Sequence, residues 1–324
     1  MEDKYKIKAC TIRKDWDNFV IKSLNKNIFT MWDYIDLENN LFKYFCLKND
    51  EVVAAFILKK SDDKLNIIKP KFLIYTPIIF RDNKNSSNAK KNLEKFEIVN
   101  FLYNYLTSNF KSFDITFDTF TNDIRPFLWS DFSNRNKKIY TNVRYTSILD
   151  LKKIDNENFL KTTFFKNFSN TMRQQYRYSS TKKFLFKEYF SKEVFMQLLS
   201  ETLEMQKVEF EKDYYNKILN KLEILNSNGY ARMFCIFNER EQPINTCIFG
   251  ILNNSSSYMY SARSKIVDNK NYSGIYLLIN CFNYLKKLNV ETVDLEGINS
   301  PERGFYKIGL GGNTKSYFNL KLIN

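Results

Sequence analysis

The chain has 324 residues, and its 50 lysines and arginines outnumber its 36 aspartates and glutamates by 14. It contains no histidine, which excludes a Ser-His-Asp triad, a Cys-His dyad and a histidine-ligated zinc site. Any proton transfer must therefore use Asp, Glu, Lys, Tyr, Cys or the substrate itself. The length corresponds to about two domains, and 44% apolar residues are enough for a sizeable core.

The five cysteines are scattered without CxxC spacing, so we expect buried free thiols in a reducing compartment and no metal site. They are Cys10, Cys46, Cys235, Cys247 and Cys281. No apolar segment typical of a signal peptide follows Met1–Lys6, and no run reaches the roughly 18 apolar residues of a membrane span. We expect a cytoplasmic protein.

The positive charge has two interpretations. Lys, Asn, Ile, Phe and Tyr are all abundant, as an AT-rich genome would produce. Codon bias does not explain why basic residues exceed acidic ones, so an anionic partner is equally compatible with the composition. Phosphorylated substrates, nucleotide sugars, CoA, tRNA and a membrane surface are the candidates.

The predicted elements of the first half begin with a strand at 5–12, a helix from Asp15 and a short helix after Thr30. A hairpin, a third strand, a polar loop, a helix and two more strands follow. These are Phe42–Leu47, Val52–Lys59, Phe72–Phe80, the loop 81–92, the helix 92–108, Phe113–Asp118 and Asn142–Leu151.

The second half repeats this order of elements. A long helix is predicted at 156–180, a strand at 184–189, and helices at 191–208 and 213–227. Three strands, a helix, a strand, a short helix and a final strand follow: Tyr230–Phe237, Ile244–Leu252, Ser257–Ser261, 273–288, Glu291–Leu295, 302–308 and Lys315–Leu322. The alternation predicts an α/β protein with mixed (α+β) sheets.

Two similar halves are suggested by a weak internal repeat. The hairpin sequence at 45–50 resembles that at 234–239. We therefore predict an N-terminal domain at 1–152 and a C-terminal domain at 153–324 that bears the active site. Two unrelated α/β domains remain the alternative.

The stretch from Asp294 to Gly312 holds five of the eight glycines, which mark left-handed backbone or close approach. Asp294 and Glu296, two residues apart on a strand, point to the same face. The strand thus ends in paired carboxylates at a glycine turn, where open sheets place ligands. A salt-bridged strand end is the alternative interpretation.

Two further groups of residues could contact a substrate. Arg173 and Arg177 share one helix face and could clamp a phosphate or carboxylate, or they form a solvated basic face. Tyr260 and Arg263 close a strand beside the sheet opening. A buried tyrosine beside an exposed arginine explains that pair equally well.

The glycine-rich stretch resembles the end of the GNAT-like domain in the Fem family and its single-chain relatives. That family has a strand ending in Asp-[Phe/Leu]-x-Gly, a short helix with an aromatic-Lys pair, and Phe-Gly-Gly. The matching segments are 294–297, Tyr306-Lys307 and 310–312, where Leu310 replaces the usual Phe. The segments 125–129 and 144–151 resemble the family's junction between its halves, and 170–177 resembles its arginine-bearing helix.

The resemblance implies two tandem GNAT-like domains and transfer of an acyl or aminoacyl group to an amine. In the Fem enzymes the donor is aminoacyl-tRNA and the acceptor a cell-wall precursor. Here we expect acyl-CoA or aminoacyl-tRNA as donor substrate, with no tightly bound cofactor. The expected acceptor is an anionic amino sugar or a lipid-linked cell-envelope precursor, with peripheral contact to the inner membrane surface. The segment 191–227 shows no long heptad pattern, so we expect no coiled-coil arm.

The same resemblance suggests roles for the residues of the stretch. Asp294 or Glu296 could orient or deprotonate the amine, Lys307 could stabilise the oxyanion or hold donor phosphate, and Tyr306 could protonate the leaving group. Alternatively, Lys307 is a solvated helix lysine and Tyr306 is packing. The remaining substrate-binding candidates are Arg173, Arg177, Tyr260, Arg263, Phe305 and Arg303.

Ser273 and Gly274 open the helix at 273–288, where CoA-using GNAT enzymes bind pyrophosphate, and are the candidates for donor phosphate. The remaining glycine pattern of that loop is absent, which disfavours acetyl-CoA. Two non-enzymatic hypotheses compete: a basic nucleic-acid binder, and an interaction scaffold on a degenerate GNAT fold. No helix-turn-helix, RRM or KH signature supports the former.

Overall fold

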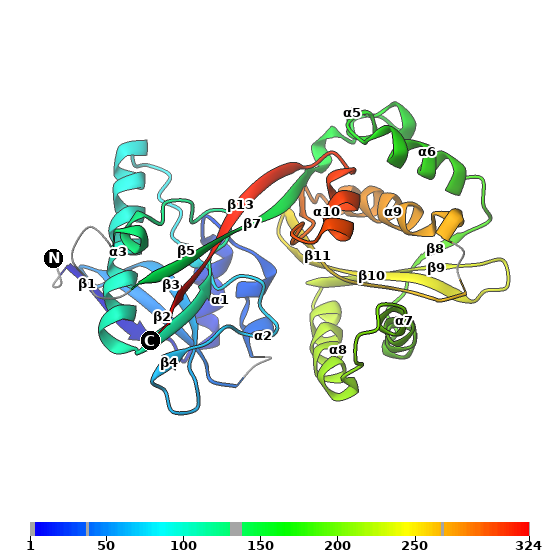
Figure 1. Ribbon diagram of the computed structural model, residues 1–324. Coiled ribbons are helices and arrows are strands. Elements are labelled where there is room, and N and C mark those ends of the chain that lie inside the picture. The colour runs from blue at the N-terminus through cyan, green and yellow to red at the C-terminus, as the bar shows by residue number, and fades with distance from the viewer. Residues whose placement is uncertain (1–3, 37–38, 130–137, 267–268, 324) are drawn as a thin grey trace. The chain divides into compact units, whose positions relative to one another are not determined.

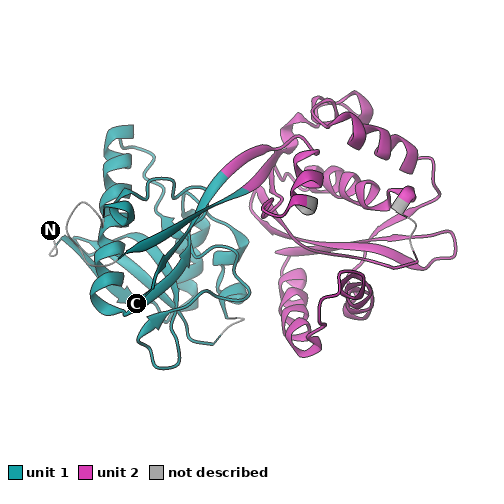
Figure 2. Ribbon diagram, viewed as in Figure 1, with its two compact units in different colours: residues 1–145, 316–324 teal, residues 146–315 magenta. Residues whose placement is uncertain are grey.

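The computed structural model describes residues 4–36, 39–129, 138–266 and 269–323, without the side chains of Glu302 and Arg303. The chain forms two compact units (Figure 2). Unit 1 comprises Met1–Tyr145 and Ser316–Asn324, and unit 2 comprises Thr146–Lys315.

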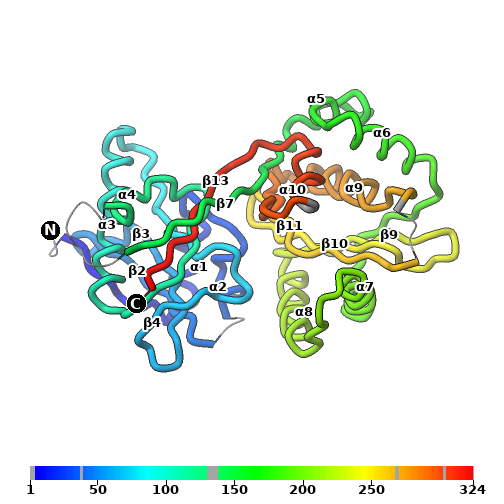
Figure 3. Tube along the Cα trace, viewed as in Figure 1, coloured from blue at the N-terminus to red at the C-terminus, as the bar shows by residue number. Residues whose placement is uncertain are grey.

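Unit 1 contains an antiparallel sheet in the order β1-β2-β3-β5. A second set of strands has the order β4-β6-β13-β7, and Figure 3 shows β13 running beside β7. The strands are β1 (Tyr5–Ala9), β2 (Leu41–Lys48), β3 (Glu51–Lys59), β4 (Asn66–Ile67), β5 (Ile78–Phe80), β6 (Ser112–Thr116), β7 (Ile139–Asp150) and β13 (Asn313–Leu322). The helices are α1 (Arg13–Lys22), α2 (Trp32–Ile35), α3 (Asn88–Asn109) and α4 (Arg125–Leu128), with a 3-10 turn at Ile28–Thr30.

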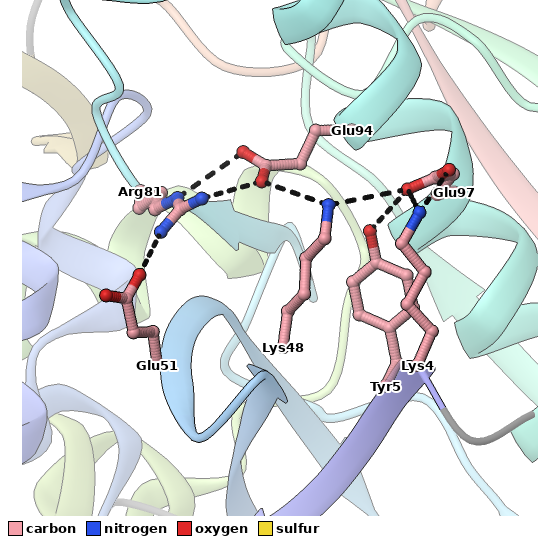
Figure 4. Close-up of polar contacts among 7 residues, drawn as sticks. All are labelled: Lys4, Tyr5, Lys48, Glu51, Arg81, Glu94 and Glu97. Carbon is pink, nitrogen blue, oxygen red and sulfur yellow. Dashed lines mark hydrogen bonds and ion pairs between the residues drawn. The ribbon is translucent and has the colours of Figure 1, made fainter.

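Helix α3 is the long helix of unit 1, and it begins where the Ser87 side chain accepts a hydrogen bond from the Lys90 amide. Its apolar face buries Ile98, Val99, Leu102, Tyr103 and Leu106 in the core. Its Glu94 and Glu97 join a chain of ion pairs and hydrogen bonds with Arg81, Lys48, Tyr5, Lys4 and Glu51 (Figure 4). These contacts tie α3 to the strands behind it.

Unit 2 is built on the strand order β7-β12-β11-β10-β9-β8, antiparallel except for the parallel pair β11 and β12. Its further strands are β8 (Leu185–Glu188), β9 (Ala231–Phe237), β10 (Pro243–Leu252), β11 (Ser255–Arg263) and β12 (Thr292–Asp294). Its helices are α5 (Thr163–Lys166), α6 (Asn170–Ser179), α7 (Lys192–Met205), α8 (Lys212–Ser227), α9 (Ser273–Lys287) and α10 (Pro301–Ile308), with 3-10 turns at Leu151–Lys153, Phe159–Lys161 and Asn269–Asn271.

The sheet of unit 2 is covered on both faces (Figure 1). Helix α9 packs on one face with α6 against it, and α7 and α8 pack on the other. Helix α9 connects the parallel strands β11 and β12, which pair only over Ser255–Ser257 and Thr292–Asp294. Their pairing ends at Asp294, the last residue of β12, and the candidate site lies at this end of the strand.

Most predicted elements are present, but four predictions need correction. The segment 156–180 is not one helix, because Thr162 and Ser169 each cap a new helix start. Of Phe72–Phe80 only Ile78–Phe80 is a strand, and the predicted loop 81–92 already contains the first turn of α3. The predicted C-terminal domain includes the last strand, whereas β13 pairs with β6, so 316–324 lie in unit 1.

The five cysteines are buried and free, as their spacing predicts. Among the described residues, no helix is both long and apolar enough to span a membrane. Nor do those residues contain a group of three or more Cys, Asp or Glu side chains placed to hold a metal ion.

Candidate active site

The chain makes a tight left-handed turn directly after β12. Glu296 has φ 50° and Gly297 has φ 23°. Asp294 stabilises this turn because its Oδ1 accepts hydrogen bonds from the Glu296 amide at 2.8 Å and from the buried Thr146 hydroxyl at 2.5 Å. The two carboxylates predicted from the sequence therefore do meet at a turn, and Asp294 determines its shape.

Lys307 of α10 closes the same turn. Its ammonium donates to the carbonyl oxygens of Leu295 at 2.5 Å, Glu296 at 2.6 Å and Gly297 at 3.3 Å. Helix α10 can approach this closely because residue 304 is glycine: a Cβ there would lie 2.4 Å from the Ile298 oxygen. Three donated hydrogen bonds use all three ammonium protons, so in this state Lys307 acts on the turn itself.

The Glu296 side chain is buried, and its Oε1 has no hydrogen-bond partner among the described residues. Burial raises the pKa of this carboxyl well above its usual value, and the negative charge of Asp294 raises it further, while Lys307 opposes the shift. This environment favours the neutral acid. Two adjacent carboxyl groups with different protonation states are a common arrangement for acid-base chemistry.

Tyr306 precedes Lys307 on α10 and also has a buried hydroxyl, which has no hydrogen-bond partner among the residues that the structure describes. Burial raises the pKa of this phenol above its ordinary value, which keeps it protonated. A Cβ placed on Gly274 would lie 3.8 Å from the Tyr306 oxygen, so the hydroxyl faces the first turn of α9. The structure thus brings Tyr306 and Gly274 together.

The first turn of α9 is already occupied by a side chain, Asn245 of β10. The Asn245 side-chain amide is oriented so that both its oxygen and its nitrogen form hydrogen bonds. The oxygen accepts from the Gly274 amide at 3.0 Å and the Ser273 hydroxyl at 2.8 Å, and the nitrogen donates to the Ile244 oxygen at 2.7 Å. Ser273 is buried. The groups predicted to bind donor phosphate therefore have an internal partner.

The predicted arginine pair lies on α6, whose start is held against the end of α10. The Ser169 amide donates to the Gly309 oxygen at 2.9 Å. Arg173 is half-buried and hydrogen-bonds Asn170, while Arg177 is exposed, with its guanidinium 5.8 Å from the Phe165 ring centroid. The pair thus sits on the helix next to α10, and neither arginine contacts the turn.

Tyr260 and Arg263 lie against α7. Tyr260 meets Phe195 with ring centroids 6.3 Å apart, and the Arg263 guanidinium lies 3.9 Å from the Met205 sulfur. A tyrosine that does lie beside Lys307 is Tyr258, whose ring centroid is 5.5 Å from the Lys307 nitrogen. Strict alternation predicts both tyrosines on one face. The register shift between Ile248 and Phe249 leaves Met259 as an extra residue, which turns Tyr258 and Tyr260 to opposite faces.

Two predicted residues of α10 remain. Phe305 is 78% exposed, an unusual position for a phenylalanine, and it precedes Tyr306 and Lys307 at the edge of the site. The Arg303 side chain lies outside the described residues.

No family model matches the chain, and no curated protein matches it. Solved structures do resemble it over nearly their whole length. The alignment with FemX covers 97% of this chain and 96% of the FemX chain, with a TM-score of 0.66 at 11% identity. The chain folds as two tandem GNAT-like domains.

Two further structures support this fold. The C-terminal domain of a putative lysylphosphatidylglycerol synthetase from Agrobacterium fabrum has a TM-score of 0.58 at 11% identity, covering 96% of this chain and 91% of its own. A tandem GNAT protein from the clavulanic acid biosynthesis pathway has a TM-score of 0.52 at 8% identity and covers 98% of both chains. The predicted fold class and the Fem/GNAT-like resemblance are confirmed at the level of the fold.

Proposed function

We propose that the protein is an acyl- or aminoacyltransferase that moves an acyl group onto an amine of an amino sugar or a cell-envelope precursor. One observation carries the proposal: the turn after β12 holds the buried carboxyl of Glu296, one oxygen of which has no partner among the described residues, together with the half-exposed Asp294 and Lys307. The tandem GNAT-like fold, shared with FemX, supports the same reaction class.

The chemistry of acyl transfer fits these residues. An amine nucleophile must lose a proton, and the acyl carbonyl oxygen gains negative charge in the tetrahedral intermediate. Asp294, at the accessible side of the turn, is suited to orient the amine and accept its proton. Glu296, as a neutral acid, is suited to donate a hydrogen bond to the oxyanion.

Lys307 is a positioning residue in this proposal, because its protons are donated to three backbone oxygens of the turn. Tyr306 offers a buried hydroxyl with no partner among the described residues and is suited to protonate the leaving group. Phe305, exposed beside them, is suited to pack against a substrate that reaches the turn.

For the donor, we favour aminoacyl-tRNA over acyl-CoA. A pyrophosphate at the start of α9 would need the Gly274 amide and the Ser273 hydroxyl, both of which Asn245 engages. The excess of 14 positive charges suits a polyanionic donor. For the acceptor, the neighbour named for lysylphosphatidylglycerol, a lipid, supports a lipid-linked molecule reached by peripheral contact with a membrane surface. The amine, on such a molecule or on an amino sugar, is part of the proposal.

The test offers the purified chain radiolabelled aminoacyl-tRNA or acyl-CoA together with amino sugars, nucleotide-linked amino sugars and amine-bearing lipids. We expect transfer from aminoacyl-tRNA and at least a tenfold loss of rate in Tyr306→Phe, which keeps the ring and removes the hydroxyl. Tyr178→Phe, on an exposed tyrosine of α6, serves as the matched control. Transfer only from acyl-CoA would reverse the donor assignment, and absence of transfer from both donor classes would overturn the proposal.

A further inference from the structure

Unit 1 contains a pocket of about 730 Å³ that the proposed function does not use. Its walls come from the end of β5, the first half of α3, the loop after β6 and α4. The volume lies in the range of small-molecule sites. Arg125 and Trp129, which frame the segment that resembles the Fem junction, both line it.

The wall of the pocket is largely apolar and unusually exposed. Leu93 is 59% exposed, Phe120 49% and Trp129 43%. Phe96 packs against Trp129 with ring centroids 5.5 Å apart. Large apolar side chains that line a cavity while remaining open to solvent are typical of a binding site.

Among the charged side chains of the lining, one cation has no ion-pair partner among the described residues. Arg125 is neutralised by Asp123 through two hydrogen bonds, at 2.8 and 2.7 Å, and stacks on the Phe96 and Trp129 rings. Lys95 is the remaining charge. Its ammonium forms no hydrogen bond or ion pair with any described residue and lies 5.5 Å from the centroid of the Phe80 ring.

The position of Lys95 is costly without a ligand. Burial lowers the pKa of its ammonium; the charge of Asp118 partly offsets this effect, and that of Lys91 adds to it. A half-buried ammonium that faces a cavity and lacks a partner is stabilised by an anion bound there.

The helix that forms one wall of the pocket, α3, is fixed by ion pairs and hydrogen bonds. Glu94 and Glu97 flank Lys95 and Phe96 along α3, and the contacts in Figure 4 fasten them to Arg81, Lys48 and Tyr5. The helix that carries Lys95 is therefore fixed before any ligand arrives, which lowers the entropic cost of binding.

We infer that this pocket is a binding site for a monoanion with an apolar body, a carboxylate on an alkyl or aryl group. The carboxylate pairs with Lys95, and the body packs against Leu93, Phe96, Phe120 and Trp129. A single ammonium without an ion-pair partner among the described residues matches one negative charge, and a wall that is largely apolar matches the rest of the molecule.

The test is binding to the full-length chain, measured by calorimetry and by the fluorescence of Trp129, with Trp129→Phe identifying the signal. Octanoate and 4-phenylbutyrate are the alkyl and aryl probes, octanamide and 4-phenylbutyramide their neutral counterparts, and AMP and inorganic phosphate the phosphate probes. We expect at least one carboxylate to bind, with a Kd at least tenfold lower than that of its amide and lower than that of either phosphate probe. The carboxylate with the lower Kd shows whether the site prefers an alkyl or an aryl group.

Lys95→Met should raise the Kd at least tenfold, while Lys90→Met, on the exposed side of α3, should leave it unchanged. Phe120→Ala provides a second variant, whose exposed ring can be removed without loss of core, and should raise the Kd at least threefold. Equal affinity for acid and amide, an unchanged Kd in Lys95→Met, tighter binding of a phosphate, or no binding at all would overturn the inference. None of these outcomes depends on transferase activity.

Discussion

Each unit buries a carboxyl group two residues beyond a strand that follows a long helix, and the two groups are treated differently. In unit 1 Asp118 follows β6, and its oxygens accept hydrogen bonds from Asn25, the Phe120 and Thr121 amides and the Thr121 hydroxyl. In unit 2 Glu296 follows β12, and one of its oxygens has no hydrogen-bond partner in the described part of the chain. The Asp118 carboxyl stabilises its loop through these hydrogen bonds, whereas the Glu296 carboxyl has an oxygen that could still accept or donate one.

The backbone of the two turns shows the same contrast. The loop of Asp118 is closed by its own amides and hydroxyls. The turn of Glu296 leaves its carbonyl oxygens to Lys307, a side chain from a different element. Because Lys307 binds the backbone oxygens of the turn, the turn is fixed without hydrogen bonds from the Glu296 carboxyl. Equivalent positions in two similar folds can thus become a structural residue in one and a candidate catalytic group in the other.

The largest expected effect is on Lys307→Met, which removes three hydrogen bonds from a charged donor. We expect the free energy of unfolding to fall by about 4 kcal/mol, because three carbonyl oxygens lose their partner. Urea denaturation measures this change. Lys287→Met, on an exposed lysine in the last turn of α9, should change it by less than about 0.5 kcal/mol. Equal stability of the two variants would show that the hydrogen bonds of Lys307 to the turn do not stabilise the protein.

The next effect concerns the pH dependence of stability. Burial raises the pKa of Asp118 from 3.8 to about 6, which corresponds to about 3 kcal/mol. A raised carboxyl pKa means that the folded state holds the proton more tightly. This contribution is therefore complete below about pH 4 and is lost as the pH rises to about 6. Asp118→Asn should abolish that decline in unfolding measurements between pH 4 and 7.

Glu296→Gln sharpens the same comparison. The pKa of Glu296 is also raised, so its contribution is complete below the ordinary glutamate range and declines as the pH rises above it. The variant should remove part of the decline in stability that remains in Asp118→Asn. An unchanged pH profile of stability in Glu296→Gln would show that this carboxyl does not hold its proton more tightly in the folded state.

Asp294→Asn is expected to lower the transferase rate about 100-fold, or about 2.7 kcal/mol in the activation barrier. Asparagine keeps the oxygen that caps the turn and removes the proton acceptor. Asp213→Asn, on an exposed aspartate of α8, is the matched control and should keep the rate. If Asp294→Asn also retained the rate, proton acceptance by this residue would be excluded.

The sequence predicted much of this fold, for physical reasons. Apolar runs on either side of a polar turn marked the hairpins at 42–59 and 230–252, whose second strands are buried along most of their length, and helix-period apolar residues marked α3 and α9. The placing of Asp294 and Glu296 together at a glycine turn followed from the sequence, although Glu296 lies beyond the end of β12 in left-handed backbone and not on the strand as predicted. The assignment of β13 to unit 1 did not, because strand pairing over 200 residues leaves no local pattern.

The site residues that the sequence missed have specific causes. Tyr258 takes the place predicted for Tyr260 because one extra residue at Met259 reverses the face, and a bulge has no reliable signature in a single sequence. Thr146 and Asn245 are polar residues on strands whose partners come from distant segments. Their buried hydrogen bonds depend on tertiary packing, which short-range spacing does not encode.

The smallest effect compares two threonines of β7. The Thr146 hydroxyl donates to Asp294, whereas the Thr141 hydroxyl is buried and has no partner among the described residues. Thr146→Val should lower the free energy of unfolding by about 1.5 kcal/mol, because an acceptor on a charged group loses its donor. Thr141→Val removes an unpaired polar group and should be neutral or stabilising. Since both substitutions change hydroxyl to methyl on one strand, the difference between them isolates the bond that shapes the turn, and equal effects would show that Asp294 does not need it.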